Sequence, residues 1–147
     1  MSPDRKPNLA VVDALKEASL KAFREGHSLE SAVIIFQTVD VLLRMSIKAF
    51  ARSRGVSNVS LNKVAEDEQS FSRLVLYFDL VCPSNILSDR LRHLNSQRNA
   101  VLHRLFYNFD SIESLRSELS EFCVEAAKLN QELRRFVGVE EAVQPGR

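Results

Sequence analysis

The sequence predicts an all-α protein, an antiparallel bundle of about five helices in a single domain over residues 1–147. Only 4 Gly and 4 Pro occur in 147 residues, which is too few turn formers for a protein rich in β-hairpins. Long segments instead repeat apolar residues every three or four positions, which is the helical period. A hydrophobic content of 45% is enough for one core in a chain of this length.

The first helix is expected to run from Asn8 to about Glu25. Asn8 is a suitable N-cap, and Gly26 follows in the position where a helix commonly ends in a left-handed residue. Residues 1–7 contain two prolines and several charges. We expect them to form a disordered leading segment.

The second helix is expected from a Ser28 cap to Arg54, just before Gly55, with an apolar face at helical spacing. That face comprises Leu29, Ala32, Phe36, Val39, Leu43, Ile47 and Phe50. Asp40 interrupts the pattern, because it lies four residues after Phe36 and three before Leu43. A carboxylate at this position of the stripe needs a partner.

Residues 55–65 are polar and are expected to form a loop, followed by a third helix from about Glu66 to Val81. Pro83 ends that helix, because a residue before proline disfavours helical geometry. Ser84 or Asn85 then begins the fourth helix.

Residues 108–111 form a short break before the fifth helix, and Asp110 with Glu113 resembles a capping box. This helix has the most regular apolar pattern of the chain: Ile112, Leu115, Leu119, Phe122, Ala126, Leu129, Leu133 and Phe136. We expect Gly138 to end it and residues 139–147 to be a disordered tail. The same stripe could instead be the seam of an oligomer, which would indicate a purely structural interaction protein.

Composition excludes several functional classes. With 20 basic and 19 acidic residues the net charge is +1, so any site for a polyanion must be a local patch. Cys82 and Cys123 lack the paired spacing of a zinc site, and we expect no metal or cofactor. Free thiols are favoured over a single disulfide.

The N-terminus lacks a signal-peptide pattern, and no run approaches the ~18 apolar residues of a membrane span, so we expect a cytoplasmic protein that binds no membrane.

The fourth helix contains the segment LNSQRNAVLHRLF, in which Arg98 interrupts a leucine stripe. At 100° per residue, apolar residues lie within about 60° of Arg98. They are Leu87, Leu91, Leu94, Val101, Leu102 and Leu105. Asn99 and His103 lie four residues apart and therefore share a neighbouring polar face, to which Arg92 also projects.

Each of these residues also has a purely structural interpretation. Arg98 can be half of a buried ion pair, for which Asp40 is the best candidate partner. His103 can be a solvated or hydrogen-bonded histidine, and Asn99 an ordinary surface amide. Tyr107 can be an amphipathic residue that closes the helix end.

The combination of these residues resembles a known family. Arg98 to His103 reads RNAVLH, which has the form R-N-x-x-x-H, on the penultimate helix of an all-helical domain. This resembles the HEPN family, named for nucleotide-binding domains of higher eukaryotes and prokaryotes. Its hallmark is an arginine and a histidine separated by a few residues, often with a polar residue directly after the arginine. The resemblance covers residues 8 to 137.

The resemblance implies a metal-independent endoribonuclease, in some members a toxin or an effector of antiviral defence, that acts as a homodimer through the motif helix. His103 would then be the acid/base at the RNA 2′-hydroxyl, Arg98 would hold the scissile phosphate, and Asn99 would orient the histidine or the phosphate. Arg92 and Tyr107 would contact the substrate. Because Arg98 and His103 are about 140° apart around the helix, the leucine seam must be partly a dimer interface for both to meet in one cleft.

The resemblance leaves one alternative open, a catalytically inactive HEPN module that binds nucleotide, RNA or a partner protein. An antitoxin or regulatory protein is a further expected partner. In one subgroup, toxins receive nucleotides from their antitoxin on a tyrosine two residues after the histidine. Leu105 occupies that position here, and the nearest tyrosine is Tyr107. This departure argues against regulation by that route.

Overall fold

The computed structural model describes residues 8–57, 70–83, 85–107 and 112–143, and for 102–107, 112 and 138–143 it describes only the backbone. Within these ranges the chain is a packed bundle of five helices without strands, which confirms the predicted fold class. The helices are α1 (Leu9–Arg24), α2 (Ser28–Ser53), α4 (Phe71–Val81), α5 (Ser88–Tyr107) and α6 (Ile112–Val143). None of these helices combines the length and apolar character that crossing a bilayer requires.

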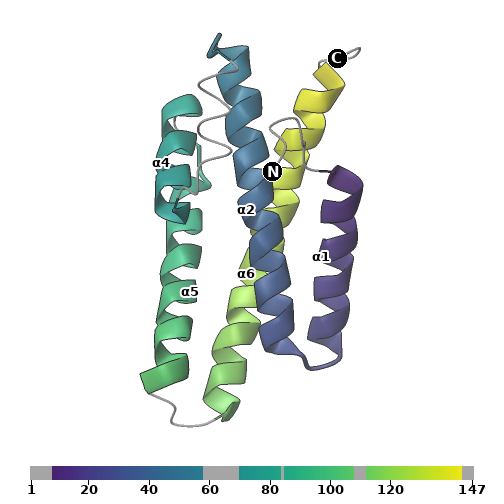
Figure 1. Cartoon of the computed structure of the whole chain (residues 1–147), viewed down its shortest axis with the longest axis vertical. Coiled ribbons are helices and arrows are strands. Elements are labelled where there is room, and N and C mark those ends of the chain that lie inside the picture. The colour runs from purple at the N-terminus through teal and green to yellow at the C-terminus, as the bar shows by residue number, and fades with distance from the viewer. Residues whose placement is uncertain (1–7, 58–69, 84, 108–111, 144–147) are drawn as a thin grey trace.

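The helices form columns that run side by side (Figure 1). α1 and α2 are antiparallel and joined by a tight turn, while α4 and α5 follow one another along the opposite side of α2. α6 returns along the bundle and packs most extensively against α2. α1 and α6 touch much less, so the space between them is only partly filled.

The ends of α1 are those that the sequence predicts. The Asn8 side chain accepts a hydrogen bond of 2.9 Å from the backbone N–H of Ala10, and Gly26 has a φ of 84°. This φ is in the left-handed region that a side chain disfavours. α2, however, is not capped by Ser28, because Ser28 is its first residue and His27 is the N-cap, without a side-chain capping bond.

α4 and α5 begin later than the sequence predicts. Ser70 caps α4, which starts at Phe71, and the predicted residues 66–69 lie outside the described residues. The Asn85 side chain accepts hydrogen bonds from the backbone N–H groups of Leu87 and Ser88, at 2.9 Å and 2.8 Å. Asn85 therefore stabilises a turn ahead of α5, and the helix starts at Ser88.

The predicted end of the last helix at Gly138 is wrong, because α6 continues to Val143. A glycine inside a helix costs about 1 kcal/mol relative to alanine, and that cost is too small to end a long helix that is favoured on both sides. The segment after Gly138, VEEAV, lacks proline and suits a helix. The Asp110 capping box and residues 144–147 lie outside the described residues.

The core is built around α2, which contributes side chains to neighbours on three sides. Its most buried large apolar residues are Ile35, Val39, Leu42, Leu43 and Ile47. They pack in one cluster with residues of α4, α5 and α6, among them Phe78, Leu91 and Leu129. The sequence also predicts Leu29 on this inner face, but its side chain is 46% exposed, because it lies at the mouth of a pocket rather than inside the core.

A buried polar pair joins the two central helices. The Asn130 side-chain amide of α6 donates a 2.7 Å hydrogen bond to Thr38 Oγ1 of α2, which itself donates to the Ile35 carbonyl. Both residues are almost fully buried. The pair satisfies polar groups that would otherwise be costly in the core and fixes the register of α2 against α6.

Removing one member of this pair should destabilise the protein more than removing both. We expect Thr38→Val to lower the free energy of unfolding by about 1–3 kcal/mol, because it leaves the Asn130 amide buried without an acceptor. Thr38→Val with Asn130→Leu should recover much of that loss. Urea unfolding followed by circular dichroism measures both, and a double variant less stable than the single one would contradict the expectation.

Candidate functional site on α2 and α5

Arg98 lies on the apolar seam of α5, as the helical projection predicts. Leu91 and Leu94 before it and Val101 after it are buried, whereas Arg98 itself is half-buried. Its guanidinium carbon lies 4.4 Å from the centre of the Phe36 ring of α2. A cation over an aromatic face gains about 0.5–2 kcal/mol, so the ring offsets part of the cost of burying the charge.

The predicted ion pair between Arg98 and Asp40 is wrong. Asp40 Oδ1 instead accepts a 2.8 Å hydrogen bond from Nε of Arg44, one turn further along α2. Residues four apart on a helix are neighbours, so the local arginine takes the carboxylate. Among the described residues, Arg98 forms no ion pair.

The polar atoms of Arg98 are only partly satisfied. Nη2 donates a 3.3 Å hydrogen bond to the side-chain oxygen of the exposed Asn99. Nε is buried and has no hydrogen-bond partner among the described residues, as is true of side-chain oxygens of Asn95 and Gln97 nearby on α5. A buried donor without an acceptor costs about 1–3 kcal/mol, which a bound acceptor would recover.

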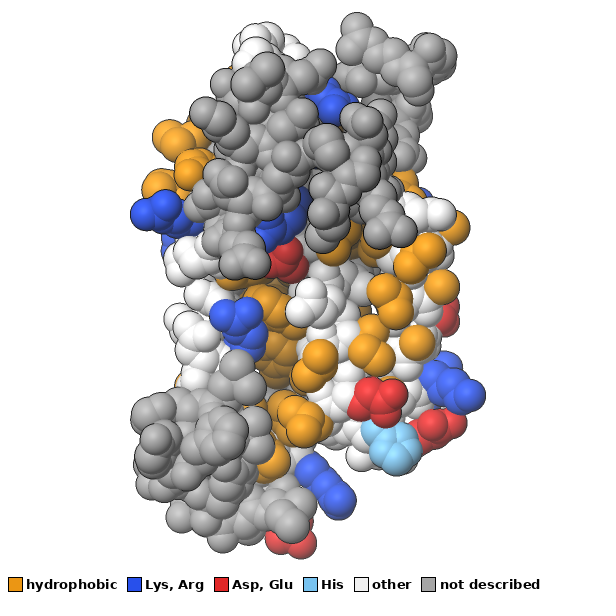
Figure 2. Space-filling model, in the orientation of Figure 1, with side chains coloured by type: hydrophobic (Ala, Val, Ile, Leu, Met, Phe, Trp, Pro, Cys, Tyr) orange, Lys and Arg blue, Asp and Glu red, His pale blue; other side chains and the backbone are white. Residues whose placement is uncertain are grey.

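A pocket of about 200 Å³ opens beside Arg98, between α2, α5 and α6. Its lining residues are Leu29, Ala32, Val33, Phe36, Gln37, Arg98, Val101, Leu119 and Phe122. Of these only Arg98 is charged. Figure 2 shows hydrophobic side chains gathered in the hollow between α2 and α5. We call this space the Arg98 pocket.

His103 and Tyr107 belong to the last turns of α5, but their side chains lie outside the described residues. Along the helix, His103 follows Arg98 by five positions, which corresponds to about 140° of rotation. The predicted roles of His103 and Tyr107 therefore stay predictions. Asn99 does adjoin Arg98, through the hydrogen bond between their side chains.

Arg92 lies on the exposed part of α5 and is held by two carboxylates. It donates to Asp89 at 3.0 Å and also to Asp79 of α4. A hydrogen bond from Ser88 lowers the pKa of Asp79, and Arg92 lowers it further against the opposing effect of burial. Two acidic groups thus balance the charge of Arg92, and RNA phosphate would have to compete with them. Sequence reasoning missed Asp79, because a different helix supplies it.

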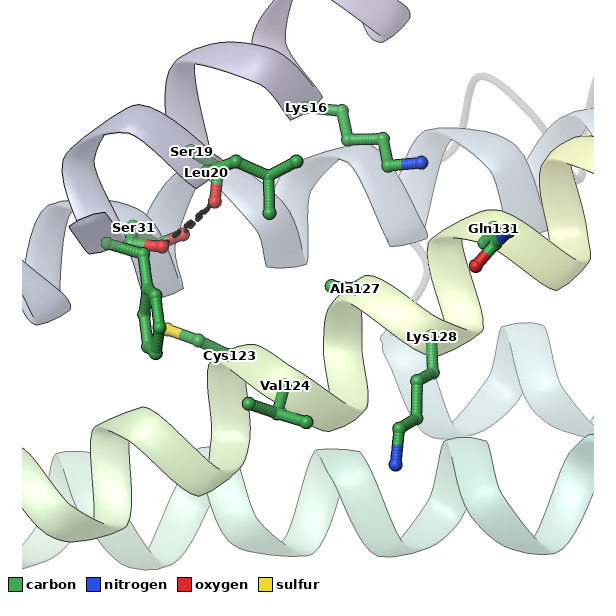
Figure 3. Close-up of a pocket in the computed structure, with 10 residues that line it drawn as sticks. Lys16, Ser19, Leu20, Ser31, Cys123, Val124, Ala127, Lys128 and Gln131 are labelled. Carbon is green, nitrogen blue, oxygen red and sulfur yellow. Dashed lines mark hydrogen bonds between the residues drawn. The ribbon is translucent and has the colours of Figure 1, made fainter.

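A second pocket, of about 350 Å³, lies where α1 and α6 are loosely packed. Its lining residues are Lys16, Ser19, Leu20, Phe23, Ser31, Cys123, Val124, Ala127, Lys128 and Gln131 (Figure 3). Ser19 Oγ donates to the Ser31 carbonyl at 2.9 Å, and burial raises the pKa of the Cys123 thiol. No sequence pattern indicates this pocket, because its residues come from three helices without a common spacing.

Neither models of known protein families nor curated proteins nor solved structures give a match to this chain. Within the described residues, no group of three histidine, cysteine or acidic side chains is arranged to hold a metal ion. The HEPN resemblance consequently depends on the motif residues and the helical architecture.

Replacing Asp79 should remove part of the acid sensitivity of the fold. Its pKa is lowered in the folded state, so its contribution to stability is present above the unfolded pKa of about 3.9 and is lost as the pH falls through the folded pKa. We expect the thermal midpoint of Asp79→Asn to fall less below about pH 4 than that of the wild type. The control is Asp89→Asn, at a side chain that is 98% exposed. If the thermal midpoint of Asp79→Asn fell with pH as steeply as that of the wild type, Asp79 would not be a source of the acid sensitivity.

The two thiols should differ in reactivity. Cys123 is buried and its pKa is raised, whereas Cys82 is only half-buried. Because the thiolate is the reactive form, we expect Cys123 to react with a disulfide reagent at least about tenfold more slowly than Cys82 does. Cys82→Ser should retain only the slow phase and Cys123→Ser only the fast one. Equal rates in the two variants would refute this expectation.

Proposed function

We propose that this protein is a metal-independent endoribonuclease of the HEPN type that acts as a homodimer. The observation that carries the proposal is the environment of Arg98. Its guanidinium is half-buried, rests on Phe36, and forms no ion pair among the described residues. A fixed cation without a counter-charge suits a phosphate ligand, because guanidinium can grip two phosphate oxygens at once.

The alternative, a purely structural role for Arg98, required an ion pair with Asp40 that the structure does not contain. A purely structural arginine within an apolar seam is normally paired with a carboxylate. Asp40 was the available candidate, and it is bound to Arg44. Nε of Arg98, which has no partner within the part of the chain that the structure describes, therefore supports binding of an external acceptor.

In the proposed reaction His103 takes the proton of the ribose 2′-hydroxyl, whose oxygen attacks the adjacent phosphorus. The bond from phosphorus to the 5′-oxygen breaks, and that oxygen accepts a proton from a second acid/base group. Arg98 stabilises the charge that develops on the phosphate, and Asn99 orients the phosphate or the histidine. The products are a 2′,3′-cyclic phosphate and a 5′-hydroxyl. Histidine suits both proton transfers, because it titrates near neutral pH.

The rotation between Arg98 and His103 along α5 supports the homodimer part of this proposal. The seam residues Leu87, Leu91, Leu94 and Val101 are buried within one chain, so these four side chains do not form the contact between copies. Arg98 and His103 are about 140° apart around the helix, so they do not face the same side. We therefore propose that Arg98 of one copy and His103 of the other form one composite site. Roles as a toxin or antiviral effector in the cytoplasm, and control by an antitoxin or regulatory protein, belong to this proposal, as does substrate contact by Tyr107.

One observation favours the alternative, an inactive module that binds nucleotide, RNA or a partner protein. Arg92, the other basic residue predicted to contact RNA, is neutralised by Asp79 and Asp89. Of the two predicted RNA-binding cations, Arg92 is paired and only Arg98 remains. The site therefore attracts RNA phosphate less strongly than the sequence suggests. An inactive module would bind its ligand without turnover.

The decisive assay is cleavage of a mixed RNA substrate in the presence of a chelator. We expect His103→Ala to reduce the rate about 10²–10⁴-fold, the usual contribution of a general acid or base. Arg98→Ala should cause a comparable loss, while Arg116→Ala, an exposed arginine on α6, should leave the rate unchanged.

Circular dichroism and light scattering of each variant establish that the helical content and the oligomeric state are retained. Undiminished cleavage by His103→Ala would refute the proposed mechanism. RNA binding by the wild type without cleavage would favour the inactive module.

A further inference from the structure

The Arg98 pocket contains more than the cation that a phosphate requires. Besides Arg98 it has apolar walls from three helices and one other polar lining residue, Gln37. We propose that this pocket holds a single base of the RNA strand, next to the phosphate bound by Arg98. This inference rests on the proposed function for the identity of its ligand. It assigns base recognition to α2, a helix that the motif does not include.

The size of the pocket suits one base. Pockets that enclose whole drug-sized ligands measure about 300–1,000 Å³, whereas this one measures about 200 Å³. It therefore accommodates a ring system while the ribose and phosphate stay outside. Asn99, exposed and hydrogen-bonded to Arg98, lies on the side where a phosphate would remain in solvent.

The chemistry of the walls also suits a base. The guanidinium carbon of Arg98 lies over the Phe36 ring, 4.4 Å from the ring centre. Bases of single-stranded RNA are commonly stacked on aromatic rings or on guanidinium planes. Phe36 itself packs against Phe122, at 6.0 Å between ring centres, and against Phe71, at 4.9 Å. Because Phe36 is only 6% exposed, the base would stack on the guanidinium, which these rings hold in place before any ligand arrives.

Gln37 supplies the means to distinguish bases. It is exposed, directly follows Phe36, and lines the pocket. Its amide carries both a donor and an acceptor, the combination that reads the edge of a base. Val33 lies one helical turn earlier on α2 and is 56% exposed at the same pocket, so a larger side chain there would fill the space without disturbing the core.

NMR titration of the full chain tests this inference. The ligands are the four nucleoside 5′-monophosphates and, as a probe without a base, ribose 5-phosphate. The nucleotides should bind at least about tenfold more tightly than ribose 5-phosphate, since stacking of one base contributes about 1–3 kcal/mol. Val33→Phe should abolish that advantage and leave ribose 5-phosphate binding unchanged. Gln37→Leu should alter the ranking of the four nucleotides.

Val124→Phe is the matched control, because Val124 is 45% exposed and lines the second pocket. Circular dichroism and light scattering ensure that both phenylalanine variants keep the fold and the oligomeric state. Equal nucleotide affinity in Val33→Phe and Val124→Phe, or equal affinity of wild type for ribose 5-phosphate and the nucleotides, would overturn the base site.

This readout separates the two proposals. Nucleotide binding that Val33→Phe abolishes, together with no RNA cleavage by the wild type, would refute the nuclease and retain the base site. Cleavage that depends on His103, together with nucleotide binding insensitive to Val33→Phe, would refute the base site and retain the nuclease.

Discussion

The central position of α2 is the constraint on which the rest of this bundle depends. α2 packs against α1, α4 and α6, and its residues Ile35, Leu42 and Leu43 are almost completely buried. A helix surrounded in this way cannot rotate or slide without opening the core, because protein interiors are close-packed. The buried hydrogen bond between Thr38 and Asn130 adds a directional restraint to the apolar contacts. Phe36 and Gln37 are therefore presented to α5 by a rigid support.

That rigidity explains how the Arg98 guanidinium can lie in an apolar seam although no carboxylate of the described residues pairs with it. Phe36 supplies a negative ring face, and the half-exposed position of Arg98 keeps part of its hydration. The remaining cost is concentrated at one atom, the buried Nε. Functional sites are often places where a structure retains such an unsatisfied group, because a ligand satisfies it. Arg44, in contrast, forms an ion pair with Asp40 and illustrates the structural use of the same residue type.

The basic residues of α5 thus have different surroundings although they share a helix. Arg92 is bound to Asp79 and Asp89, Arg90 is bound to Glu132 of α6 at 2.6 Å, and Arg98 alone of these three faces an apolar pocket. A near-neutral chain can consequently still present one focused cation. Net charge describes long-range attraction, whereas the surroundings of a single arginine decide what it can bind.

Helical periodicity was sufficient to predict the all-α bundle, the order of its helices and the position of Arg98 within the leucine seam, because these follow from local spacing along the chain. The end of α6 was mispredicted, since a single glycine is a weak signal against a long favourable helix. The partner of Asp40, the pairing of Arg92 with Asp79 and the pocket between Phe36, Arg98 and Leu119 depend on distances between helices. Spacing along the chain does not show which side chains of different helices lie close together. These contacts are therefore decided only by how the helices pack.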